Sequence, residues 1–153
     1  MDRREQLTDA FVTASRALVG IAVHSVGAAP VEVTVAQFRL LVLVASEGGR
    51  AIGDIAERLG VNQSNASRHC DRLQRLGLVE RRRSAKDARV VRVLLTARGR
   101  ALVQDVMQQR RADVRRVVGR LADEDAAAAL QVLQAFNKAA EELDEEQWSR
   151  KLW

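Results

Sequence analysis

The sequence predicts a mainly α-helical protein with one small β-hairpin. Apolar residues recur every three or four positions over most of the chain, which is typical of amphipathic helices. After Gly77 this pattern gives way to two short alternating runs, which indicate paired strands. The length of 153 residues is that of one domain, so we expect a single unit over residues 1–153.

The first two helices are predicted from apolar spacing and from their end signals. One apolar face covers about residues 4–26, and Gly27 and Pro30 end this helix. Thr34 followed by Gln37 is a capping box, which predicts that a second helix begins there. The apolar face of the first helix requires a partner surface, and its residues are Leu7, Phe11, Ala14, Leu18 and Ile21.

Two short helices joined by a tight turn follow. The third helix ends at Gly60, and Asn62 is suited to cap the fourth. Helical geometry turns Ala66, Cys70 and Leu73 of the fourth helix toward the core. The outward positions that remain are Gln63, Ser64, Asn65, Ser67, Arg68, Arg72 and Arg75.

A hairpin and two further helices complete the chain. Residues 79–83 and 91–95 alternate as strands do, and the polar stretch 84–87 lies between them. Thr96 is suited to cap a long helix, and acidic residues near Asp123 indicate the start of the last one. The apolar positions of that last helix, which we expect to be buried, are Leu130, Leu133, Ala140 and Leu143.

Composition excludes several classes of protein. With 47% hydrophobic and 29% charged residues, the chain has the composition of a soluble globular protein. The longest uncharged run, Ala17 to Val31, is shorter than the roughly 20 residues that cross a bilayer, so we expect no membrane span. Asp9 and Arg16 break the apolar core that a signal peptide needs, and Cys70 is the single cysteine. We therefore expect a cytoplasmic protein without disulfides.

Charge is strongly segregated along the chain. From Arg58 to Arg100 twelve basic residues stand against three acidic ones, whereas residues 121–153 carry three basic and eight acidic residues. A basic middle segment predicts a site for a polyanion, with a solvated basic face as the alternative. Two short helices followed by an arginine-rich hairpin are the pattern of a winged helix-turn-helix, which binds double-stranded DNA.

The outward side chains of the fourth helix are of the types that read a major groove. Glutamine and asparagine pair with adenine, arginine pairs with guanine or phosphate, and serine bonds to either. An ordinary polar helix face is the alternative interpretation. Asp71 lies deeper along the helix, where we expect it to orient an arginine rather than to contact DNA.

The hairpin carries Asp87-Ala88-Arg89, followed after five residues by Leu95-Thr96 and then Gly99. This spacing is similar to the wing signature of the MarR (multiple antibiotic resistance regulator) family, which the chain resembles. The resemblance implies a winged helix-turn-helix over residues 34–99, with dimerisation helices at 1–30 and 100–153. It also implies a bacterial, ligand-responsive repressor that binds a pseudo-palindromic operator as a homodimer.

Individual roles follow from the same resemblance. Arg89 is expected to enter the minor groove beside the recognition helix, and Asp87 is expected to orient Arg89. Arg83 and Lys86 are expected to contact phosphates, while Arg81 and Arg82 serve either phosphates or a solvated strand. The effector is expected to be a small aromatic or phenolic acid in a pocket with Arg16, His24 and Arg39, although a lone histidine is more often a core or interface residue.

Other activities lack the residues they need. Cys70 is expected to be a buried structural thiol rather than a redox sensor, and adjacent His69 and Cys70 cannot share a metal, so we expect no metal and no cofactor. The chain has no complete set of catalytic groups, which argues against an enzyme. Trp148 and Trp153 are expected to contact a partner subunit, with a frayed tail as the alternative. The remaining alternative is an interaction protein or antirepressor of the same fold that does not read DNA.

Overall fold

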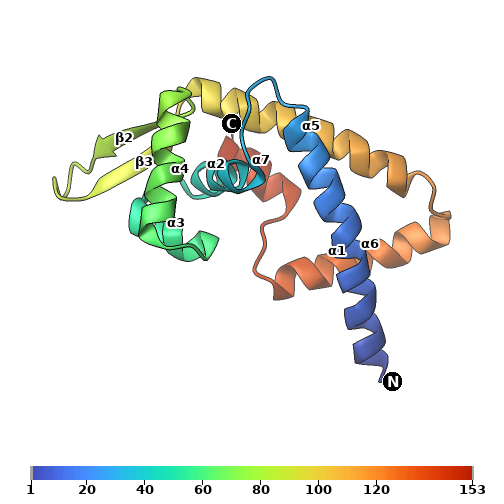
Figure 1. Ribbon diagram of the computed structural model, residues 1–153. Coiled ribbons are helices and arrows are strands. Elements are labelled where there is room, and N and C mark those ends of the chain that lie inside the picture. The colour runs from blue at the N-terminus through green and yellow to red at the C-terminus, as the bar shows by residue number, and fades with distance from the viewer. Residues whose placement is uncertain (1, 153) are drawn as a thin grey trace.

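The computed structural model describes residues 2–152, apart from the side chains at 149 and 152, and its helices surround one small sheet (Figure 1). The predicted fold class, mainly α with a small hairpin in a winged helix-turn-helix, is confirmed. The elements are α1 (Arg3–Gly27), α2 (Val35–Glu47), β1 (Arg50–Ala51), α3 (Ile52–Leu59), α4 (Gln63–Arg75), β2 (Val79–Arg83), β3 (Val91–Leu95), α5 (Ala97–Val118), α6 (Asp123–Ala139) and α7 (Glu145–Leu152).

The predicted end signals form the expected caps. The Thr34 hydroxyl accepts the Gln37 amide at 3.1 Å, and the Gln37 side chain accepts the Thr34 amide at 3.0 Å. Asn62 accepts the Asn65 amide at 2.8 Å at the start of α4. Gly60 has a φ of 66°, a left-handed conformation that glycine adopts at little cost and that lets the chain turn sharply from α3 into α4.

The sheet has three strands in the order β1-β3-β2, all antiparallel. The hairpin pairs Val79 with Leu95 and Arg83 with Val91, as the alternating pattern predicts. The short strand β1 was not predicted, because two residues are too few to show alternation. It pairs with β3 and so holds one edge of the hairpin.

The core is centred on α2, which lies between the short helices α3 and α4 and the long helices α1 and α5 (Figure 1). Phe38, Leu40 and Leu41 of α2 are fully buried, and so are the inward residues Cys70 and Leu73 of α4. Because α3, α4 and the base of the hairpin all pack on the same core, the helix-turn-helix and the hairpin form one body.

The carboxyl-terminal region differs from the prediction. Leu130, Leu133 and Ala140 are exposed in the single chain and Leu143 is only partly buried, so the burial expected for the first three requires a surface outside the protomer. The chain leaves α6 at Ala139 and forms a separate helix, α7, which was not predicted. A short break at residues 140–144 divides the acidic stretch that sequence periodicity merged into one helix.

Trp148 belongs to the core of its own chain. Its side chain is buried, and α7 packs on α2. The expectation that this residue latches onto a partner subunit is therefore wrong. Burial of a large aromatic side chain is strongly favourable, and α7 places Trp148 against the core of its own chain. Trp153 lies outside the described residues.

Helix α1 is long and apolar enough to cross a membrane by length and composition alone. One 18-residue window reaches a mean hydropathy of 1.4, whereas the sequence prediction was based on the shorter uncharged run from Ala17 to Val31. The absence of a membrane span stays a prediction, because a helix that packs against protein passes the same measure. Apolar side chains of α1 are exposed in the single chain, as a helix that packs on a second copy would also require.

Candidate nucleic-acid interface

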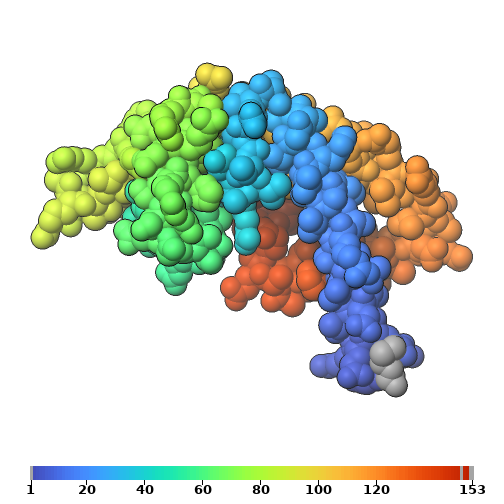
Figure 2. Space-filling view, viewed as in Figure 1, coloured from blue at the N-terminus to red at the C-terminus, as the bar shows by residue number. Residues whose placement is uncertain are grey.

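Helix α4 presents a polar face to the outside of the molecule. It lies on the near face in Figure 2, and the hairpin projects from the body beside it. Ala66, Cys70 and Leu73 are fully buried, as predicted, so the remaining side chains face outward or sideways. Gln63, Ser64, Arg68 and Arg72 are exposed, and Asn65 and Ser67 are partly exposed.

The arginine side chains of α4 are held along the helix. The Arg68 guanidinium donates to the side-chain oxygen of Asn65, one turn earlier. Arg75 Nε donates to the Asp71 carbonyl oxygen over 3.4 Å. Each of these contacts uses one of the nitrogens of a guanidinium group that has five N–H donors, on an exposed, amphipathic helix.

Arg89 stands at the tip of the hairpin. Its side chain is 92% exposed, and its Nε donates to Asp87 Oδ1 over 3.3 Å. The same carboxylate oxygen accepts the Arg89 backbone amide at 3.0 Å. Asp87 therefore contacts both the main chain and the guanidinium of Arg89, which is the geometry expected of a residue that orients it. Lys86 and Arg83 are exposed on the same tip.

The base of the hairpin is tied to the helix-turn-helix by ion pairs. Arg81 Nη1 lies 2.7 Å from Asp71 Oδ1, so Asp71 orients an arginine as predicted. Glu47 at the end of α2 pairs with both Arg50 of β1 and Arg58 of α3. Arg81 is thus paired with an acid of α4, and the sequence analysis missed this pairing because it could not tell which acid meets which arginine.

Known proteins share this architecture. A family model described as the MarR family matches residues 32–90. The HTH-type transcriptional repressor MdtR of Bacillus subtilis is 32% identical over 115 residues, which are 75% of this chain and 74% of MdtR. The crystal structure of RV1404 from Mycobacterium tuberculosis is 34% identical, with a TM-score of 0.86 over 95% of this chain and 99% of that chain.

The chain belongs to the MarR family of transcriptional regulators. FabT of Streptococcus pneumoniae, solved in complex with DNA, has the same fold at 20% identity, with a TM-score of 0.70 over 92% of this chain and 98% of that chain. The winged helix-turn-helix of MarR-family regulators is therefore present here from α2 to β3.

The expected effector pocket of this MarR-family chain is not assembled within one protomer. His24 lines a cavity of about 460 Å³ between α1 and α5, with Ile21, Arg116 and Val117 among its walls. Arg39 lines a different cavity, of about 230 Å³, beside Trp148. Arg16 lines neither of these cavities, and its guanidinium donates to Thr13 on its own helix over 3.3 Å.

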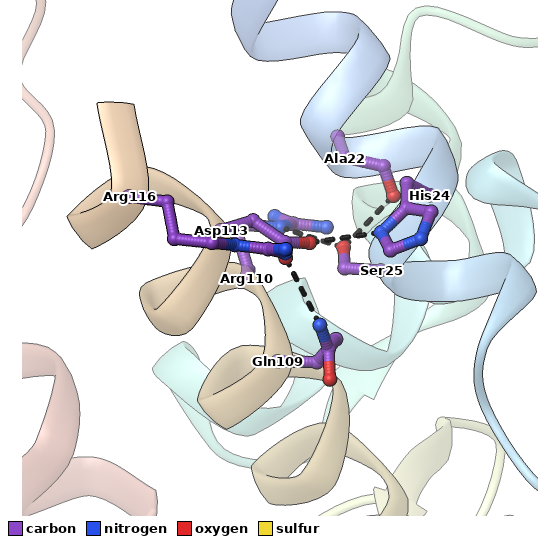
Figure 3. A network of polar contacts seen from close by, with 7 residues as sticks. All are labelled: Ala22, His24, Ser25, Gln109, Arg110, Asp113 and Arg116. Atoms are coloured by element: carbon purple, nitrogen blue, oxygen red, sulfur yellow. Dashed lines mark hydrogen bonds and ion pairs between the residues drawn. The ribbon is translucent and has the colours of Figure 1, made fainter.

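A polar network that the sequence analysis missed lies at the His24 cavity (Figure 3). Asp113 is buried, and its Oδ2 accepts from His24 Nδ1 at 2.9 Å. Its Oδ1 accepts from Gln109 at 3.0 Å and from Arg116. The hydrogen bond from His24, followed by those from Arg116 and Gln109, holds the pKa of Asp113 below its ordinary value although burial opposes them. The signal in the sequence was an acid at an inward position of a long helix.

Arg110 extends this network toward the core. Its Nε donates to Ser25 Oγ over 3.2 Å, and its guanidinium lies 5.3 Å from the centre of the Phe38 ring. Burial lowers the pKa of Arg110. The link between α1, α5 and α2 is therefore made of charged and polar groups rather than of apolar contacts alone.

Cys70 is fully buried, as predicted, and burial raises the pKa of its thiol, with Arg81 acting in the opposite direction. A protonated, inaccessible thiol is a poor nucleophile. Within residues 2–152, no group of three or more histidine, cysteine, aspartate or glutamate side chains is placed to hold a metal ion.

Proposed function

We propose that this MarR-family regulator is a cytoplasmic homodimeric repressor that reads a pseudo-palindromic operator and carries out no catalysis. The observation that carries the proposal is the pairing of the exposed polar face of α4 with the exposed Arg89 at the tip of the adjoining hairpin. In this proposal α4 enters the major groove and Arg89 enters the neighbouring minor groove. The name of MdtR as a repressor and the DNA complex of FabT support it.

The proposed groove contacts use residues of both elements. Each subunit would read one half-site, and the two recognition helices of a two-fold dimer would lie about one helical turn, roughly 10 base pairs, apart. The contact residues of the proposal are Gln63, Ser64, Asn65, Ser67, Arg68 and Arg72 on α4 and Arg83, Lys86 and Arg89 on the wing, with Asp87 orienting Arg89.

The homodimer is supported by uncovered apolar surface. Leu7 and Leu18 of α1 and Leu130, Leu133 and Phe136 of α6 are exposed in the single chain. Phe11 and Phe136 stack with ring centres 4.3 Å apart, so the two helices approach each other far from the hairpin (Figure 1). Burying such a patch against its two-fold copy removes it from water.

A small aromatic or phenolic acid is proposed as the effector, in a pocket that the dimer completes. Within one chain the cavity beside His24 offers apolar walls together with Arg116 and Arg120. Such a cavity suits an apolar monoanion. An effector of this kind would relieve repression by favouring a dimer with a different spacing of the recognition helices.

The test is a selection of genomic fragments on the purified protein, followed by titration of the recovered fragment and of a shuffled duplex over a salt series. We expect saturable binding to the recovered fragment that resists excess shuffled duplex and falls steeply with salt. Arg72→Ala should weaken it, whereas Arg150→Ala, an equal loss of charge on α7, should not. A protein that enriches no fragment over random duplex would instead be the interaction protein or antirepressor.

A further inference from the structure

Arg81 lies on the side of the hairpin that faces the recognition helix. Side chains of a strand alternate between its two faces, so Arg81 shares a face with Val79, which is buried in the core. From that face the guanidinium reaches α4 at two points. Its Nη1 lies 2.7 Å from Asp71 Oδ1, and its Nη2 donates to the Ser67 carbonyl oxygen over 3.4 Å.

The guanidinium of Arg81 is largely withdrawn from solvent. Its side chain is 26% exposed, compared with 68% for Arg82, which follows it and pairs with Glu80 at 2.6 Å. The Nε of Arg81 is buried. Arg81 also contacts the buried Cys70 thiol. It therefore fills the junction between β2 and α4 rather than facing outward as Arg82 does.

Arg81 is placed where the hairpin leaves the body of the protein. Beyond it the β2 residues Arg82 and Arg83 are exposed, and on the partner strand the buried Val93 pairs with Arg81 in register. Strand β1 holds the other edge of the hairpin by pairing with β3. The direction in which the wing projects from α4 is thus set on one side by β1 and on the other by the contacts of Arg81.

We propose that Arg81 and Asp71 form a clamp that fixes the angle between the wing and the recognition helix, and that both are positioning residues for DNA binding rather than DNA contacts. This inference rests on the proposed function. DNA that binds α4 and Arg89 at the same time requires a fixed distance between them. If Arg89 is displaced, it must be brought back into place when DNA binds, and this lowers the affinity. The alternative is that Arg81 binds a phosphate directly.

The two roles predict opposite signs for Asp71→Asn. Removing an acid from a DNA-binding face reduces repulsion of the phosphates, so Asp71→Asn strengthens binding if charge alone matters. If the clamp positions the wing, the same substitution weakens binding although the protein becomes more positive. Glu80→Gln is the matched control, since it removes one acid from β2, the strand that carries Arg81, and leaves the clamp intact.

The experiment compares wild type, Asp71→Asn, Arg81→Met, the double variant and Glu80→Gln on the genomic fragment recovered in the selection. We expect Asp71→Asn and Arg81→Met each to weaken DNA binding at least about fivefold. The affinity of the double variant should be no lower than that of the single variant that binds less tightly. The slope of log affinity against log salt should stay at the wild-type value. Glu80→Gln should bind as tightly as wild type or more tightly.

A different pattern overturns the clamp. If Arg81→Met lowers the salt slope by about 0.9 and Asp71→Asn tightens binding, Arg81 is a phosphate ligand. Unchanged affinity in both single variants overturns it as well. Circular dichroism and urea titration establish that each variant is folded before its affinity is interpreted.

A second readout needs no DNA and separates failure of the clamp from failure of the proposed function. Cys70 is fully buried against Arg81, so loosening the junction should raise the rate at which a thiol reagent modifies it in the native protein. We expect Asp71→Asn and Arg81→Met to react at least about fivefold faster than wild type. Thr34→Ala, which removes the α2 cap elsewhere, controls for general loss of stability. Wild-type rates in both clamp variants would overturn the proposal whether or not the protein binds DNA.

Discussion

A β-carbon added to Gly99 would lie 2.0 Å from the carbonyl oxygen of Leu78. The same oxygen accepts the Thr96 amide at 3.1 Å, and the Thr96 hydroxyl donates to the Gly77 carbonyl oxygen at 2.6 Å. The first turn of α5 is thus pressed directly against the chain that joins α4 to β2. This contact explains why a threonine and a glycine follow the hairpin at this spacing.

Gly99→Ala should therefore destabilise the protein. Backbone rather than a flexible side chain meets the new methyl group, so α5 must shift, at a cost of about 1–3 kcal/mol or more. Urea denaturation followed by circular dichroism measures the loss. Gly53→Ala is the control, because nothing lies within 4 Å of a β-carbon there and alanine favours helix. Equal stabilities for the two variants would contradict the close approach.

Arg89→Ala should weaken binding to the selected DNA fragment and lower the salt slope by about 1, since one cationic contact is lost. Arg150→Ala on α7, also an exposed arginine paired with an acid, is the matched control and should leave both quantities unchanged. Mobility shift or fluorescence anisotropy over a salt series measures the two together. A variant that keeps the wild-type affinity and slope would remove Arg89 from the proposed interface.

Leu133→Asp should convert the proposed dimer to a monomer. Leu133 is 46% exposed in the single chain and lies on the apolar face of α6, where a charge cannot be buried against a second copy without a large cost. Sedimentation velocity reports the mass. Val35→Asp, at a residue of similar exposure (43%) in the first turn of α2, should remain dimeric. A Leu133→Asp protein with the mass of a dimer would place the interface elsewhere.

Asp113 should make the stability depend on pH at the acid end. Because its pKa is lowered in the folded state, the unfolded chain binds this proton more readily, and the stabilisation is present above the unfolded pKa of about 3.9 and lost as the pH falls through the folded pKa. The difference in unfolding free energy between wild type and Asp113→Asn should therefore shrink as the pH is lowered from 7 to 3.

Urea titrations at several pH values test this expectation. Asp105→Asn, which replaces an exposed carboxylate of the same helix and leaves the His24 contact in place, should follow the wild-type protein through the series. A constant difference between wild type and Asp113→Asn would show that the charge of Asp113 contributes nothing to the stability of the junction.

Local signals predicted the DNA-binding half of the molecule well. Capping residues such as Thr34, Asn62 and Thr96 accept a hydrogen bond from the amide three positions later, so a few consecutive residues suffice to predict the cap. The inward face of α4 followed from helical periodicity in the same way. The grouping of Arg16, His24 and Arg39 did not follow from local signals: the family resemblance implied it, and within one chain the fold places the three residues at different points.

The sequence by itself determined helices α1 to α6, the turns at Gly60 and Gly77, the hairpin and the family, because each depends on neighbours along the chain or on a short motif. Only the tertiary structure decided which charges meet. Asp71 with Arg81 and His24 with Asp113 are polar contacts between different elements, and β1 and α7 exist because β3 and the α2 core receive them. Such contacts join residues that come close only when the chain has folded, so they cannot be predicted from periodicity or composition.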